Sequence, residues 1–210
     1  MGLKEAKMNF VVEKATSLFM QKSISEVTIR DIAIEAGVGE ATIYRYFENK
    51  ENIVLACVMH LQKEINENYF KLDEGKTGFD KIEIFYLSYL DVFKTNPDYF
   101  YFVKEFDAYM YTQNSSILKN YEKGIDQYHS NFINAYELGL KDKSIEPVKN
   151  IDVFYYSTTH SLMELCKKLS IKKALLTQDK KIKKIAEIQC LIKIVLNSLK
   201  SCESNASKNK

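Results

Sequence analysis

Turn-forming residues are scarce in this chain, and their scarcity restricts its fold more than any other feature of the sequence. The 210 residues include only 7 Gly and 2 Pro. Tight hairpin turns need residues that tolerate a positive φ or that fix the backbone, so a many-stranded sheet would require more of them. With 46% hydrophobic residues, the chain can nevertheless bury a core of ordinary size. The predicted fold class is therefore all-α.

Several other classes of protein do not fit the sequence. The longest unbroken apolar run, residues 53–59, is far too short to span a bilayer, and the first ten residues lack the apolar block of an export signal. The four cysteines lie far apart without a C-x-x-C pair, so neither a zinc site nor a disulfide framework is indicated. We expect a cytoplasmic protein with reduced thiols, no cofactor, no metal and no membrane partner.

Apolar residues recur at helical spacing along the chain, and capping residues separate the segments. A Thr-x-x-acid capping box begins at Thr28, and Asn96-Pro97-Asp98 combines a cap, a proline at the first helical position and an acid near the helix start. About nine helices are predicted, over about residues 4–22, 28–36, 39–47, 49–70, 78–95, from 97 onward, 115–140, 151–172 and 178–200.

The most informative segment is residues 28–53, T-IRDIAIEAGVGEATIYRYFENKENI. Two short helices meet at the tight turn Gly37-Val38-Gly39. Small apolar residues, Ala33 and Ala36, let the helices cross closely, and Ile43 lies on the second helix. This arrangement is a helix-turn-helix, whose second helix can enter the major groove of DNA.

The segment resembles the N-terminal DNA-binding domain of the TetR (tetracycline-repressor-like) family of bacterial transcriptional regulators. The resemblance covers about residues 5–55 and rests on Ala15, Leu18, Phe19, Thr28, Ile29, Ile32, Ala33, Ala36, Gly37, Val38, Thr42, Ile43, Tyr44, Tyr46, Phe47, Lys50 and Glu51. It implies an N-terminal three-helix DNA-binding domain followed by a larger helical domain for ligand binding and dimerisation. We predict domains at residues 1–50 and 51–200, with a disordered tail at 201–210.

The resemblance also implies a set of DNA contacts. Phosphate contacts are expected from Thr28, Thr42, Tyr44 and Lys50, and the residues near base edges are Glu40, Ala41, Arg45 and Tyr46. Gly39 also belongs to the expected DNA-binding residues; the family commonly has Ser there, and Gly39 still serves as a helix cap. The family commonly has Gly in place of Ala41. Glu40 either accepts from a cytosine amino group or points aside. Tyr46 and Phe47 are alternatively core residues, which makes Tyr44 the better contact.

Weak charge on the N-terminal domain favours a dimer. The first 60 residues carry seven basic and eight acidic side chains, so a single domain should bind phosphates poorly. A two-fold protein on a palindromic operator doubles the contacts. The family forms its dimer from the last two helices, where an apolar stripe runs along Phe154, Ser157, Thr158, Ser161, Leu162, Leu165, Ile185, Ile188, Gln189, Ile192, Val195 and Leu196. The stripe alternatively covers only the subunit's own core.

Aromatic residues concentrate between residues 78 and 136, in a chain without Trp. Some of these rings pack in a helical core, and the resemblance implies that others surround a small-molecule effector. The expected lining is Tyr86, Tyr89, Phe93, Phe102, Glu105, Phe106, Tyr128, Phe132 and His160. Because a carboxylate beside aromatic faces suits a cation, the expected effector is aromatic or cationic.

The predicted function is a homodimeric transcriptional repressor that an effector releases from a palindromic operator. Two alternatives stay open: a DNA-binding protein of the same fold without an effector, and a helical adaptor that does not bind DNA. An enzyme is not expected, because no nucleophile motif or glycine-rich phosphate loop occurs. His160 and Glu164, four residues apart, form a polar pair more readily than a metal site.

Overall fold

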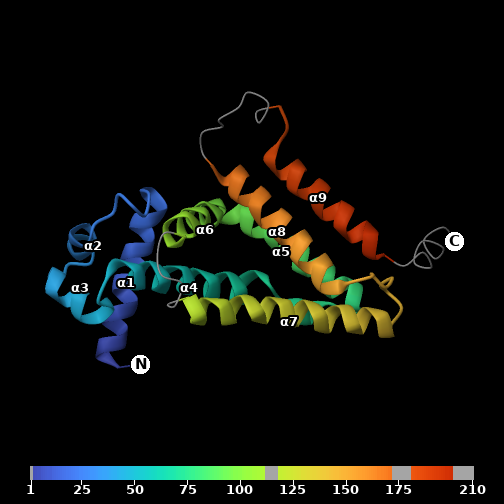
Figure 1. Ribbon diagram of the computed structural model, residues 1–210, viewed down its shortest axis with the longest axis horizontal. Helices are drawn as coiled ribbons and strands as arrows, with labels where there is room; N and C mark the ends of the chain where they lie inside the picture. Colours follow the sequence, from blue (N-terminus) through green and yellow to red (C-terminus); the bar gives the residue numbers. More distant parts are fainter. Residues whose placement is uncertain (1, 112–117, 172–180, 201–210) are drawn as a thin grey trace. The chain divides into compact units, whose positions relative to one another are not determined.

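The computed structural model describes residues 2–111, 118–171 and 181–200. Within these ranges the regular elements are helices, apart from one isolated bridge between Ile145 and Lys200, which confirms the all-α class (Figure 1). The expected helix starts near residues 115 and 178, the helix end at 172 and the tail 201–210 lie outside the described residues. Among the described helices, none has the length and apolar character needed to cross a bilayer.

The helix bounds follow the capping signals closely. The α-helices are α1 (Leu3–Gln21), α2 (Ile29–Glu35), α3 (Glu40–Phe47), α4 (Lys50–Tyr69), α5 (Gly78–Thr95), α6 (Pro97–Met110), α7 (Lys119–Lys141), α8 (Ile151–Ser170) and α9 (Lys184–Leu199), with a short 3₁₀ helix, η1 (Leu72–Glu74). The last helix starts later than predicted, since residues 181–183 are not helical. Lysines crowd this segment, and cations are unfavourable at the positive end of a helix.

The chain divides into two compact units. The first contains residues 1–64 and 101–124, and the second contains residues 65–100 and 125–210. In the first unit, the buried core includes Val11, Ala15 and Phe19 of α1, and the rings of Phe19 and Phe102 lie 6.2 Å apart. In the second unit, Phe85 is central, with its ring 5.3 Å from both Tyr86 and Phe132.

Within the second unit, α5 and α7 approach each other unusually closely at two glycines. A methyl group added to Gly78 would lie 2.0 Å from the backbone nitrogen of Gly139. The loop after α7 then caps α5, because Asp142 accepts from the Gly78 N–H at 2.8 Å and Ser144 from the Phe79 N–H at 3.0 Å. The scarce glycines are thus used where two helix backbones meet.

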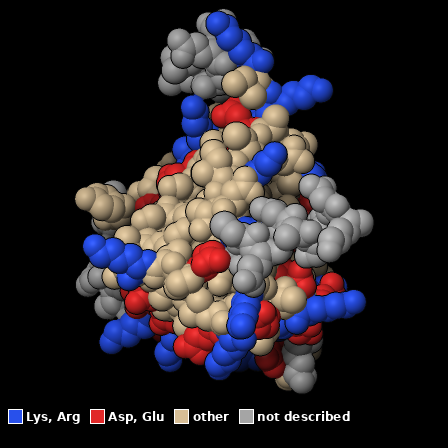
Figure 2. Space-filling model, turned by 90° about the vertical axis from the view of Figure 1, so that its right-hand side faces the viewer, with Lys and Arg blue, Asp and Glu red and all other residues tan. Residues whose placement is uncertain are grey.

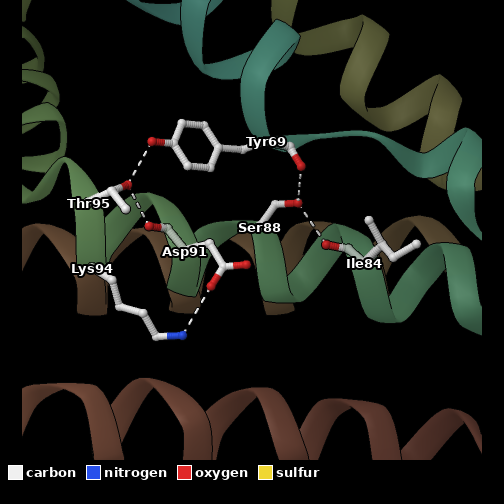
Figure 3. Close-up of polar contacts among 6 residues, drawn as sticks. All are labelled: Tyr69, Ile84, Ser88, Asp91, Lys94 and Thr95. Carbon is white, nitrogen blue, oxygen red and sulfur yellow. Dashed lines mark hydrogen bonds and ion pairs between the residues drawn. The ribbon is translucent and has the colours of Figure 1, made fainter.

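Polar contacts fix the C-terminal end of α4 onto α5 in the same unit (Figure 3). The Tyr69 phenol lies 2.7 Å from the Thr95 hydroxyl, which itself donates to the Asp91 carbonyl at 2.8 Å. The Ser88 hydroxyl donates to the Tyr69 carbonyl, also at 2.8 Å. Since both the side chain and the carbonyl of Tyr69 are engaged, this helix end is held at two points.

Candidate nucleic-acid interface

Helix α2 begins at a complete capping box. The Thr28 hydroxyl accepts from the Asp31 N–H at 3.1 Å, and the Asp31 carboxylate accepts from the Thr28 N–H at 2.8 Å and from its hydroxyl at 2.6 Å. These hydrogen bonds from Thr28 hold the pKa of Asp31 below its usual value. To donate to a DNA phosphate, the Thr28 hydroxyl must therefore break its hydrogen bond to the Asp31 carboxylate.

The turn between α2 and α3 depends on the left-handed conformation of Gly37, whose φ is +64°. Around it, the Gly37 N–H donates to the Ile34 carbonyl at 3.1 Å, and the Val38 N–H donates to the Ala33 carbonyl at 3.0 Å. This pair of bonds is a Schellman motif, which satisfies the last carbonyls of α2 and reverses the chain direction. The predicted turn is confirmed, with the small residues Ala33 and Ala36 buried as expected.

Helix α3 presents one face to the core and another to solvent. Ile43 and Phe47 are buried, whereas Glu40, Ala41 and Arg45 are exposed and Thr42 is half-buried. Tyr44 is 50% exposed, so its phenol is accessible to solvent. Gly39 caps the helix in extended backbone without a side-chain hydrogen bond. The first turn of α3 is thus accessible to a ligand.

Two of the expected contact residues rest on aromatic rings. The Arg45 guanidinium lies 5.3 Å from the centre of the Tyr46 ring, which is half-buried. The Lys50 amine lies 5.4 Å from the ring centre of Tyr109, whose hydroxyl donates to Glu51 at 3.0 Å. Burial lowers the pKa of Lys50. Sequence reasoning missed Tyr109, because no local pattern connects α6 to the start of α4.

Comparison with known proteins agrees with this geometry. A sequence model described as bacterial regulatory proteins of the tetR family matches residues 11–57, a range that contains every expected DNA contact. Residues 11–57 are a TetR-family DNA-binding segment. Among curated relatives, the chain is 30% identical over 67 residues to the HTH-type transcriptional regulator BetI of Brucella anthropi, covering 32% of this chain and 34% of that protein.

A second curated relative is an HTH-type transcriptional regulator of Staphylococcus aureus, 31% identical over 98 residues, which are 46% of this chain and 48% of that protein. The chain thus matches between a third and a half of the length of these relatives. Solved structures extend the likeness in fold to nearly the whole chain. The ketosteroid transcriptional regulator KstR2 of Mycobacterium tuberculosis covers 92% of this chain and 95% of its own, with a TM-score of 0.65 and 14% identity.

A regulator from Saccharomonospora viridis in complex with choline has a TM-score of 0.71 and 20% identity, covering 94% of this chain and 98% of its own. The TM-scores of these two structures establish a shared fold. It does not transfer the ligand.

The expected effector-lining residues fall into both units. Phe102, Glu105 and Phe106 belong to the first unit, where both phenylalanines are fully buried. The second unit contains the others, Tyr86, Tyr89, Phe93, Tyr128, Phe132 and His160. His160 is exposed and lies beside Tyr156, with ring centres 5.7 Å apart and the ring planes tilted by 42°.

A cluster of tyrosines surrounds Tyr89 in the second unit. Burial, with Tyr155 and Tyr128 nearby, raises the pKa of Tyr89 well above its usual value. The Tyr86 hydroxyl lies 2.6 Å from the Thr158 hydroxyl. The sequence predicted Tyr86, Tyr89 and Tyr128 as effector-lining residues. It did not predict Tyr155, which lies on α8, outside the aromatic-rich segment. The periodicity of α8, which fits a buried position at Tyr155, could have indicated it.

The expected dimer stripe on α8 and α9 divides between two environments. Leu162, Ile188, Ile192, Val195 and Leu196 are buried in this unit's own core, while Ser157, Ser161, Ile185 and Gln189 are exposed and Phe154, Thr158 and Leu165 lie between. Large apolar side chains outside the stripe are exposed instead: Val153, Tyr156 and Ile194. Figure 2 views the molecule from the side on which α9 lies in Figure 1 and shows a broad uncharged area with charged side chains around it.

Proposed function

We propose that this protein is a DNA-binding transcriptional regulator that acts as a homodimeric repressor of a palindromic operator and is not an enzyme. In this proposal residues 1–50 bind DNA, and residues 51–200 bind an effector and dimerise. The observation that carries the proposal is the exposed first turn of α3, positioned by the Gly37 turn and by the buried Ile43 and Phe47. A helix presented in this way fits the major groove of B-DNA.

The residues of α3 supply different kinds of contact. Arg45 can reach guanine through two parallel hydrogen bonds. Its guanidinium already packs over the Tyr46 ring, so it loses less conformational entropy when it binds DNA. Glu40 can accept from a cytosine amino group. The hydroxyls of Thr42 and Tyr44 and the amine of Lys50 suit phosphate oxygens, which position the helix without reading the sequence.

The dimer is proposed to form through α8 and α9. Val153 and Tyr156 on α8 and Ile194 on α9 leave apolar area exposed, and the last is 62% exposed. Burial of such side chains against a second copy stabilises a dimer by removing apolar surface from water. Sedimentation of the Ile194→Glu variant should show a shift toward monomer. Ile34→Glu, at a comparably exposed isoleucine on α2, should remain dimeric, and an unshifted Ile194→Glu would contradict this interface.

The effector site is proposed to include Tyr86, Tyr89, Tyr128 and Phe132 in the second unit, with Phe93 and His160 of the same unit as further candidates. Phenol-rich surroundings suit a cation, because aromatic faces attract positive charge. The choline complex of the Saccharomonospora viridis regulator supports this chemistry on the same fold. Repression would be relieved because the effector prefers the state that does not bind the operator. A thermal-shift screen of choline and aromatic compounds tests this part, and no stabilisation would count against it.

The deciding experiment is a gel-shift assay with DNA from the protein's own upstream intergenic region at several salt concentrations. The wild type should give a specific shift that Tyr44→Ala loses. Tyr111→Ala is the matched control, because Tyr111 is a still more exposed tyrosine of the first unit and lies outside the DNA-binding segment. No shift of any fragment at low salt would refute the proposal and favour the adaptor. A specific shift that no small molecule releases would favour an effector-independent regulator.

A further inference from the structure

A groove separates the N-terminal half of α1 from the turn and α3 in the first unit. It has a volume of about 510 Å³. Lys7 and Phe10 line it on α1, and Thr42, Arg45 and Tyr46 line it on α3. The groove therefore joins three expected DNA-contact residues to a part of α1 that precedes residues 11–57, the range matched by the TetR-family sequence model.

The charge of the groove differs from that of the domain around it. Its lining includes the cations Lys7 and Arg45 and contains no Asp or Glu, although acidic residues outnumber basic ones in the first 60 residues. Within the described chain, no hydrogen bond or ion pair engages the Lys7 amine, which is exposed. Two cations that face one groove without a counter-charge favour an anionic occupant.

Another lysine of α1 provides a comparison. Lys14 lies two turns further along the helix, 3.8 Å from the Glu35 carboxylate, with its amine 5.6 Å from the Phe10 ring centre. Its charge is therefore already balanced by a neighbouring helix of the same unit. Lys7 and Lys14 share a helix and a charge, but only Lys7 lines the groove.

We propose that one strand of the duplex DNA backbone lies in this groove and that Lys7 is an additional phosphate contact. The proposal rests on the proposed function, since it concerns the same DNA complex. On the α3 wall, Arg45 would then face the bases and Thr42 the phosphates. On the α1 wall, Lys7 would neutralise a phosphate. Phe10, which is 46% exposed, offers an apolar surface to the deoxyribose. Such a contact positions α3 and adds affinity without base specificity.

The test compares Lys7→Gln and Lys14→Gln with the wild type in operator affinity as a function of salt. Each phosphate contact contributes about 0.9 to the slope of log K against log salt. On a palindromic operator with two half-sites, Lys7→Gln should therefore reduce the magnitude of the slope by about 1.8. Lys7→Gln should weaken binding to operator DNA and to unrelated DNA by the same factor. Lys14→Gln should leave the slope unchanged. Circular dichroism of both variants confirms that each is folded.

The outcomes separate this proposal from the one on which it rests. If the wild type binds the operator and the folded Lys7→Gln variant has the same slope of log K against log salt as the wild type, the Lys7 contact is overturned and the proposed function stays intact. Equal loss in Lys7→Gln and Lys14→Gln also overturns it, because general electrostatic attraction would then suffice. Absence of any DNA binding by the wild type overturns both proposals.

Discussion

Two glycines of the helix-turn-helix, two residues apart, should respond in opposite directions to the same substitution. Gly37 has a φ of +64°, whereas Gly39 has an ordinary φ of −75°. A Cβ atom at either position would meet nothing within 4 Å, so steric clashes do not distinguish them. Replacement of each by serine therefore isolates the effect of backbone conformation.

The magnitudes follow from the two conformations. A left-handed backbone costs a non-glycine residue about 1–2 kcal/mol, and the loss of glycine's freedom in the unfolded chain offsets about 0.4–1 kcal/mol of this. Gly37→Ser should thus lower the free energy of unfolding by about 1 kcal/mol. Gly39→Ser keeps the gain from the smaller entropy of the unfolded chain and adds a side-chain cap that contributes a few tenths of a kcal/mol. It should therefore raise the free energy of unfolding by about 1 kcal/mol.

Urea unfolding followed by circular dichroism measures both variants. The midpoints should move to opposite sides of the wild type with unchanged slopes, and the thermal midpoints should differ by about 4–8 °C between the two variants. Amide hydrogen exchange in α2 and α3 should show that the change is local to the turn. Midpoints that move in the same direction would refute the argument that the conformation of Gly37 controls the turn.

Three further predictions concern other backbone and capping features. Gly78→Ala should lower the free energy of unfolding by at least about 2 kcal/mol, because its methyl group would lie 2.0 Å from the Gly139 backbone nitrogen, and an unchanged urea midpoint would contradict that close approach. Glu48→Gly should raise stability by about 1 kcal/mol in the same assay, since Glu48 has a φ of 67° and ends α3 in a strained conformation; a lower midpoint would refute this. The Thr28 hydrogen bonds depress the pKa of Asp31, so their stabilisation is present above the unfolded pKa of about 3.9 and is lost as the pH falls through the lower folded value. Asp31→Asn should therefore lose less stability than the wild type when the pH falls below 4, and identical acid profiles would rule out this contribution.

The helix starts were predictable because their signals are local. The capping boxes at Thr28 and Thr77 and the proline at the start of α6 act on backbone groups within one helical turn. The turn at Gly37 was predictable for the same reason. A resemblance over three helices then identified the exposed residues of α3, where the predicted contact residue Tyr44 is half exposed.

Features that join distant parts of the chain were not predictable from pattern alone. Lys50 stacks on Tyr109 and Gly78 meets Gly139, and each pair is separated by about 60 residues. Lys167 is followed directly by Lys168 in the sequence, yet its side chain is 9% exposed and pairs with Glu164 at 2.7 Å. Local charge and hydrophobic periodicity reflect a residue's neighbours along the chain. They do not show which helix packs over that residue in the folded protein.

The helical class, the capping signals and the helix-turn-helix follow from the amino-acid sequence, because helices, caps and tight turns depend on interactions between residues a few positions apart. Packing between helices, in contrast, sets which apolar residues of α8 and α9 are buried in the unit's own core and which, such as Ile194, remain exposed. It also places Lys7 in the same groove as Arg45. Both depend on packing between helices, where many side chains compete for the same space and periodicity specifies a face but not its partner.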